Sequence, residues 1–120
     1  MAREAALMRP EIGTATDRAA AVRARLARTA DPDLLAEEVE NALCGGYAQA
    51  LAGDAWLAES ERRLHDLIDD STIELRGRDL RALMREHGAV QRRIIALRCE
   101  LEALRREHDR QRSGSHARSV

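Results

Sequence analysis

The sequence predicts an all-α protein whose main body is an antiparallel two-helix coiled-coil hairpin, with an extra short N-terminal helix or arm. The first supporting observation is composition. Ala, Leu, Arg and Glu dominate the 120 residues, charged residues make up 34% of them, and aromatic residues only 2%. This composition is typical of long helices and leaves little material for a thick globular core. The other two observations are an apolar repeat and a segregation of charge.

The apolar repeat lies near the C-terminal end. Alternating steps of three and four residues define a helix-packing seam formed by Leu80, Leu83, His87, Val90, Ile94, Leu97, Leu101 and Leu104. Arg and Glu account for eight of the 17 residues between these positions, so the apolar stripe is narrow, as in helices that supercoil around a partner helix. His87 is polar, and we expect it to set the register or the choice of partner, or to make the pairing sensitive to pH.

Charge is segregated along the chain. Residues 31–74 contain twelve acidic residues against two arginines, whereas residues 75–120 contain twelve arginines against six acidic residues. The first 30 residues have six arginines and three acidic residues, and the net charge of the whole chain is −1. An acidic segment followed by a basic one favours pairing of the two within the chain.

The acidic helix is predicted for residues 31–70. Asp31 suits the N-cap and Pro32 suits the first helical position. Its own seam contains Val39, Leu43, Gly46, Ala50, Gly53, Leu57, Ser60, Leu64 and Leu67. The small residues in this seam allow a facing helix to come close, or receive a large side chain such as Trp56 or Tyr47. Alternatively, Gly45 and Gly46 kink the helix.

The basic helix is predicted for residues 72–112, after a turn in which Ser71 and Glu74 have capping-box spacing. Two segments of nearly equal length and a tight turn suit an antiparallel hairpin. Residues 1–30 are expected to form a mobile arm or a marginal helix, capped by Thr14 or Thr16. The polar tail, residues 113–120, is expected to be disordered.

No reactive constellation is visible. Glu61, His65 and Asp69 share one helical face at a spacing that suits metal ligands, but a single helix rarely completes a coordination shell, so we expect a solvated face and no metal. Phosphate-binding loops, dinucleotide fingerprints and nucleophile elbows do not occur in the sequence. We therefore predict that the protein is not an enzyme and uses no cofactor.

The sequence indicates a cytoplasmic protein. It contains no apolar run near the ~18 residues that span a membrane, and the stretch Met1–Glu4 lacks the hydrophobic core of a signal peptide. Cys44 and Cys99 lie far apart, without a C-x-x-C spacing, and we expect them to be reduced thiols.

The leading functional hypothesis is a small protein-interaction module, a regulator that sequesters a transcription factor through a helical face. Candidate partner contacts are Arg92, Arg98 and Arg105. One alternative is a structural coiled coil that assembles with itself, as a homodimer for example. Another is a nucleic-acid-binding accessory that uses the basic C-terminal helix, although interleaved acidic residues and the lack of an aromatic platform disfavour it.

Three runs carry a family resemblance: Leu80-Arg81-Ala82-Leu83, Val90-Gln91-Arg92-Arg93, and residues 97–107. Together they resemble the RsiG-like anti-sigma factor family. The resemblance implies an antiparallel hairpin that holds a sigma factor, in some members together with cyclic di-GMP. In the register set by Ala103-Leu104-Arg105, the family's nucleotide motif E-x3-S-x2-R-x3-Q-x3-D falls on His87, Gln91, Ile94, Arg98 and Glu102. None of these five residues matches the motif, so we expect no cyclic di-GMP site.

Overall fold

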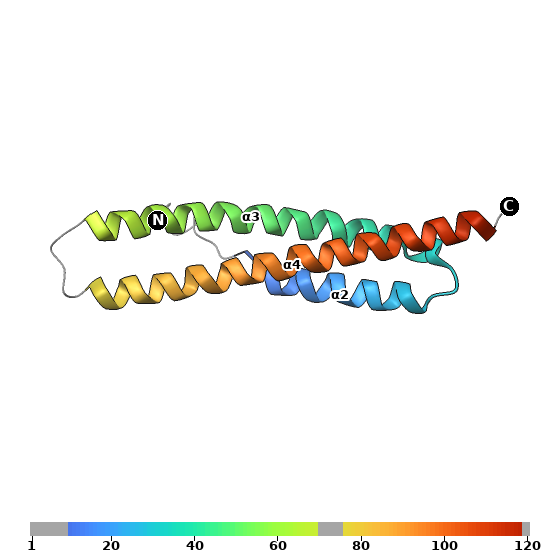
Figure 1. Cartoon of the computed structure of the whole chain (residues 1–120), viewed down its shortest axis with the longest axis horizontal. Helices are drawn as coiled ribbons and strands as arrows, with labels where there is room; N and C mark the ends of the chain where they lie inside the picture. The colour runs from blue at the N-terminus through green and yellow to red at the C-terminus, as the bar shows by residue number, and fades with distance from the viewer. Residues whose placement is uncertain (1–9, 70–75, 119–120) are drawn as a thin grey trace.

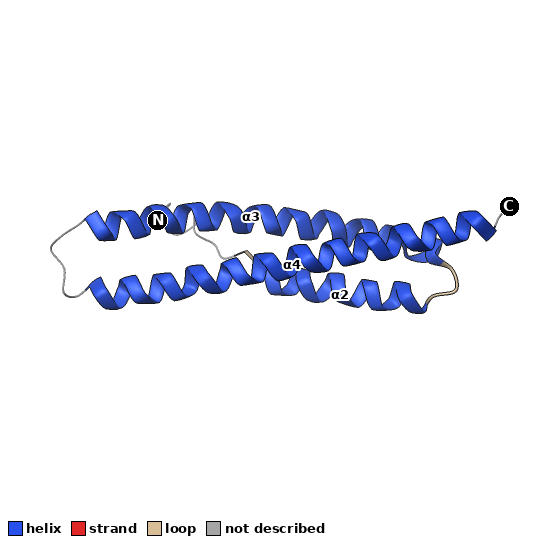
Figure 2. Cartoon of the chain, viewed as in Figure 1, coloured by secondary structure: helices blue, strands red, loops and turns tan. Residues whose placement is uncertain are grey.

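The computed structural model describes residues 10–69 and 76–118. These residues form three α-helices and one 3₁₀ turn, namely α2 (Ile12–Arg28), η1 (Pro32–Leu35), α3 (Ala36–Asp69) and α4 (Arg76–Arg118) (Figure 1). Within the described ranges there is no strand, which confirms the predicted all-α class (Figure 2). The molecule is elongated, with principal extents of 72 × 25 × 17 Å.

The two long helices lie side by side and run in opposite directions, and α2 covers only part of their length (Figure 1). At one end of α2, the side chain of Ile12 lies near Gly53 of α3. At its other end, the backbone carbonyl oxygen of Leu26 accepts a hydrogen bond from the side-chain Nε2 atom of Gln111 at 3.5 Å. The C-terminal part of α4 and the N-terminal part of α3 therefore belong to a three-helix region.

Helix α2 begins at Ile12, earlier than a threonine cap would place it. Thr16 does not cap the helix, because its hydroxyl donates to the carbonyl oxygen of Ile12 at 2.9 Å within the helix. Of the two alternatives for residues 1–30, the structure has a helix at residues 12–28. The arginines of its last turn, Arg25 and Arg28, suit the negative end of the helix dipole.

The boundaries of the long helices follow local signals. The carboxylate of Asp31 accepts from the backbone amide of Asp33 at 3.2 Å, but the turn it opens is 3₁₀, and regular α-helix begins at Ala36. Helix α3 is then unbroken through its two adjacent glycines to Asp69. The expected capping box of Ser71 lies outside the described residues. Helix α4 extends to Arg118, beyond the expected end at 112, because each residue added to a formed helix gains a hydrogen bond.

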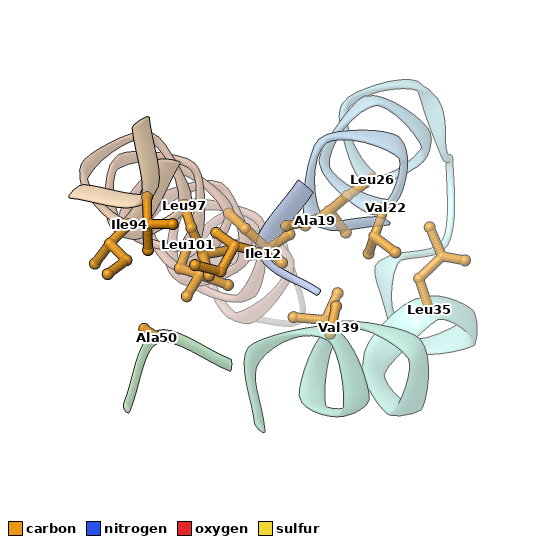
Figure 3. Packing of buried hydrophobic residues seen from close by; sticks show 13 residues of the cluster. Ile12, Ala19, Val22, Leu26, Leu35, Val39, Ala50, Ile94, Leu97 and Leu101 are labelled. Atoms are coloured by element: carbon orange, nitrogen blue, oxygen red, sulfur yellow. The ribbon is translucent and has the colours of Figure 1, made fainter. Parts of the chain in front are cut away.

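The hydrophobic core lies where the three helices meet (Figure 3). Its buried residues are Ile12, Ala19, Val22, Leu26, Leu35, Val39, Ala42, Ala50, Val90, Ile94, Leu97, Leu101 and Leu104. Helix α4 contributes five of its eight seam residues, from Val90 to Leu104, to this core. The other three, Leu80, Leu83 and His87, are only half-buried. Beyond the reach of α2, the two long helices therefore pack without a third described helix.

Candidate protein-interaction face

Large residues of α4 lie opposite small residues of α3 at steps of seven. Leu101 lies against Gly46, Ile94 lies against Gly53, and the Nδ1 atom of His87 is 3.2 Å from the hydroxyl oxygen of Ser60. A Cβ atom on Gly53 would stand only 2.7 Å from the Cδ1 atom of Ile94. Side chains of α4 thus fill the space beside the two glycines. Tyr47, one of the two aromatic side chains considered for this role, is 38% exposed.

The contacts of α2 define one side of this helix pair. Arg23 of α2 binds Glu100 at 2.5 Å and Arg25 binds Glu38, and each of these glutamates directly precedes a buried core residue, Leu101 or Val39. An α-helix has 3.6 residues per turn, so the residue that follows a core-facing position points to the other side.

Asp54 illustrates this opposite side. It follows Gly53 in α3, and its carboxylate binds the guanidinium of Arg98 through contacts of 2.5 and 3.2 Å. This contact raises the pKa of Arg98 above its ordinary value, chiefly through the hydrogen bond from the guanidinium to Asp54. We call this side of α3 and α4, opposite α2, the open face. A facing residue is one that lies opposite the other long helix, such as Gly46 and Gly53 on α3 or Ile94 and Leu101 on α4. The open face is formed by the residues one, four or five positions after each facing residue.

The exposed large hydrophobic residues of α3 and α4 in the described ranges all belong to the open face. They are Tyr47, Leu51, Ile68, Met84 and Ile95, with exposed fractions between 38% and 67%. Ile68 lies two seven-residue steps from Asp54, and Met84 lies two such steps from Arg98. Apolar residues therefore take the place of the ion pair near the end of the two long helices that α2 does not reach. Hydrophobic groups gathered on one side of a surface are typical of interaction sites.

The two edges of the open face carry opposite charge. The charged residues on the α3 edge are Glu37, Glu40, Asp54 and Glu61, and this edge has no arginine. The arginines on the α4 edge are Arg78, Arg81, Arg85, Arg92, Arg98, Arg105, Arg106 and Arg112. Glu102 and Asp109 are the acidic residues of that edge. The three arginines predicted as partner contacts, Arg92, Arg98 and Arg105, therefore share one face, and all are exposed.

A groove of about 470 Å³ hollows the open face at the end near η1. The side chains of Val39 and Leu43 give it an apolar part, and Glu40, His108 and Arg112 line it with charge. Its position on the open face follows from Glu40 and Arg112, which lie two seven-residue steps from Asp54 and Arg98.

A smaller hollow, of about 190 Å³, lies between α2 and α3, over Gly45 and Gly46. The Oε1 atom of Gln49, which lines it, is buried and has no hydrogen-bond partner in the described part of the chain. A site limited to one small hollow and one amide oxygen offers little for specific recognition.

The structure does not bring the metal-like trio together. Among residues 10–69 and 76–118, no three His, Cys, Asp or Glu side chains are placed to hold a metal ion. Glu61 lies instead near His87, with 3.9 Å between its carboxylate oxygen and the Nε2 atom. Cys44 and Cys99 are both exposed free thiols.

Comparison of this chain with protein-family models, with curated proteins and with solved structures found no match. No helix in the described ranges has a stretch long and apolar enough to cross a membrane.

The sequence analysis found the seam but missed the open face. Seam positions repeat along one helix, whereas the open face combines two helices and requires knowledge of the side that α2 covers. A signal was present nevertheless, because Ile95 directly follows Ile94 and Ile68 directly follows Leu67. An apolar residue next to a seam position widens the stripe on one side only.

Proposed function

We propose that this protein is a small helical protein-interaction module in which α3 and α4 act as an antiparallel coiled-coil hairpin and the open face docks a helical partner. One observation carries the proposal: the exposed large hydrophobic residues of α3 and α4 lie on the side opposite α2. Fully burying a large apolar side chain contributes about 1.5–3 kcal/mol, so a helix that covers this face gains stability from each residue it buries.

The chemistry of the face specifies the class of partner. A helix that binds it needs apolar residues at steps of three and four to cover Leu51 and Ile95. Charge on its flanks then orients it, because the α3 edge attracts basic residues and the α4 edge attracts acidic ones. The resemblance to the RsiG-like family supports a regulatory role, with a sigma factor or another transcription factor as the sequestered partner.

A capture experiment tests this proposal. The protein is immobilised as the wild type and as the double variant Leu51→Glu/Ile95→Glu, which places two charges on the open face. The control is Ala55→Glu/Ala96→Glu, which changes exposed alanines that point away from both neighbours. Bound proteins are identified by mass spectrometry.

We expect the wild type and the control to retain the same proteins and the open-face variant to lose them. Recovery of a sigma factor would identify the predicted regulatory partner. If the open-face variant retains everything that the control retains, the open face is not the docking surface.

A further inference from the structure

We infer that the open face binds a second copy of this chain, related by a two-fold axis along the long dimension, so that α3 of each copy packs on α4 of the other. This inference rests on the proposed function, because it assigns an occupant to the same face. The product would be a central four-helix bundle, with the α2 helices on its two outer sides.

Charge is the first reason to choose a second copy. In the described chain, the α3 edge of the open face has only acidic charged residues, and the α4 edge has eight arginines and two acidic residues. A surface with one acidic and one basic edge is complementary to itself when the acidic edge of each copy faces the basic edge of the other. A closed dimer with two-fold symmetry uses one patch on both subunits and requires this self-complementarity.

Charge also chooses between the two possible axes. Two helix pairs can meet face to face about an axis along their length or about an axis across it. The crosswise axis would place α3 on α3, which brings Asp54 and Glu61 near the same acidic edge of the other copy. The lengthwise axis places α3 on α4 and brings acidic side chains to arginines, which is favourable.

The register of such a dimer follows from contacts within one chain. Gly46 lies opposite Leu101 and Gly53 opposite Ile94, so Leu51 is level with Ala96. A lengthwise axis keeps each residue at its level. Leu51 then meets the partner's Ile95, the open-face residue nearest that level, and both are exposed in the single chain, by 67% and 58%.

The same levels pair charges across the interface. On the open face, the residue nearest the level of Asp54 is the partner's Arg92, and the residue nearest the level of Glu61 is the partner's Arg85. Near the other end, the partner's Arg106 is the open-face residue nearest the level of Glu40. These three acidic residues of the α3 edge in one copy therefore match three arginines of the α4 edge in the other. Neighbouring members of both sets are seven or fourteen residues apart, and the pairs flank the apolar contact of Leu51. A repeat of opposite charges beside an apolar seam is how coiled coils fix partner and register.

Sedimentation equilibrium of the full chain is the first test. We expect the wild type to have twice the chain mass of 13.4 kDa. Leu51→Glu/Ile95→Glu should raise the dimer dissociation constant at least about tenfold, as expected for central interface residues, while Ala55→Glu/Ala96→Glu leaves it unchanged. Circular dichroism checks that both variants keep their helices, since all four residues are exposed.

Charge reversal tests the axis. Arg85→Glu and Glu61→Arg should each weaken the dimer, and the double variant should recover its strength, because the reversed charges meet again across the interface. Loss of dimer in both single variants without recovery in the double variant would overturn the proposed register.

Cysteine cross-linking distinguishes the two axes directly. In a chain carrying Cys44→Ser and Cys99→Ser, the pair Leu51→Cys and Ile95→Cys should yield disulfide-linked dimers, whereas Leu51→Cys alone should not. Cross-linking by Leu51→Cys alone would place α3 on α3 and contradict the lengthwise axis.

A wild-type chain that stays monomeric at all concentrations overturns the dimer altogether. The proposed function survives that result if captured proteins still depend on Leu51 and Ile95, and it fails separately if they do not. A further outcome is a full chain that is monomeric and a variant lacking residues 1–9 that dimerises. That outcome would show that the chain covers its own open face.

Discussion

Leu101 of α4 occupies the space beside Gly46 of α3 where the Cβ atom of any other residue would lie. In the described part of the chain, nothing lies within 4 Å of the corresponding position on Gly45, one residue earlier. Two adjacent glycines in one unbroken helix therefore serve different purposes. Gly46 permits the close packing of the long helices, whereas Gly45 only weakens the helix by its intrinsic propensity.

This difference predicts opposite effects for the same substitution. Gly46→Ala should destabilise the protein by about 1–3 kcal/mol, because the added methyl group overpacks against a fully buried leucine. Gly45→Ala should stabilise it by up to about 1 kcal/mol, because alanine is the better helix former and its methyl group would meet none of the described residues. Urea denaturation followed by circular dichroism measures both. Equal effects of the two substitutions would contradict the packing described.

The polar contact between Ser60 and His87 interrupts an apolar seam. Ser60 is 2% exposed, and its hydroxyl oxygen lies 3.2 Å from the Nδ1 atom of His87. Ser60→Ala should cost about 1 kcal/mol because it leaves the imidazole without this partner. The double variant Ser60→Ala/His87→Leu should be at least as stable to unfolding as the wild type, since it places an apolar pair at this position of the seam. A double variant less stable than Ser60→Ala alone would show that the histidine packs better than leucine at this position.

Leu26 holds the end of α2 in the core. Its side chain has no exposed surface, and Leu26→Ala should destabilise the protein by about 2–5 kcal/mol through the cavity it leaves. The control is Leu34→Ala, which truncates a leucine that is 76% exposed and should change stability little. Hydrogen exchange should show faster exchange of the α2 amides in Leu26→Ala. If α2 amides exchange as in the wild type, the helix is held by other contacts.

Glu107 predicts a stability that depends on acid pH. Hydrogen bonds from Arg110, and then from Gln111, hold the pKa of the Glu107 carboxyl below its ordinary value of 4.5. A carboxyl with a lowered pKa in the folded state stabilises the protein above its ordinary pKa, and this contribution is lost as pH falls through the lowered value. Because the side chain of Arg110 is 73% exposed, the contribution is only about 0.3–0.5 kcal/mol.

Glu107→Gln therefore should be slightly less stable than the wild type at pH 7, and the difference should shrink at acid pH. Thermal unfolding between pH 7 and pH 3 measures it. The matched control is Glu102→Gln, whose carboxylate makes a longer contact of 3.4 Å with Arg106. A difference that grows as the pH falls would have the wrong sign and would refute the assignment.

The sequence was sufficient for the helical class and for much of the local structure. The three-and-four spacing from Val90 to Leu104 identifies residues that are buried in the fold, and Asp31 accepts a hydrogen bond from the following turn, as its position before Pro32 suggests. These features depend on side-chain periodicity and on hydrogen bonds between near neighbours, which a single segment contains.

The sequence was not sufficient for the role of α2. Its apolar face is thin, and its buried residues Ala19 and Val22 are small, so local pattern alone left the choice between an arm and a helix open. The long helices provide the missing stabilisation, because helices in proteins gain most of their stability from packing.

By itself, then, the sequence determined the helix class, the seam and the opposite charge of the two long segments, since each is a property of residues close together in the chain. Only the tertiary structure decided which small residue of α3 receives which side chain of α4, and which side of the pair α2 covers. The open face with Leu51 and Ile95 follows from the position of α2, because it is the side of the helix pair that α2 leaves uncovered. It is defined by contacts between distant segments, which no periodicity within one segment encodes.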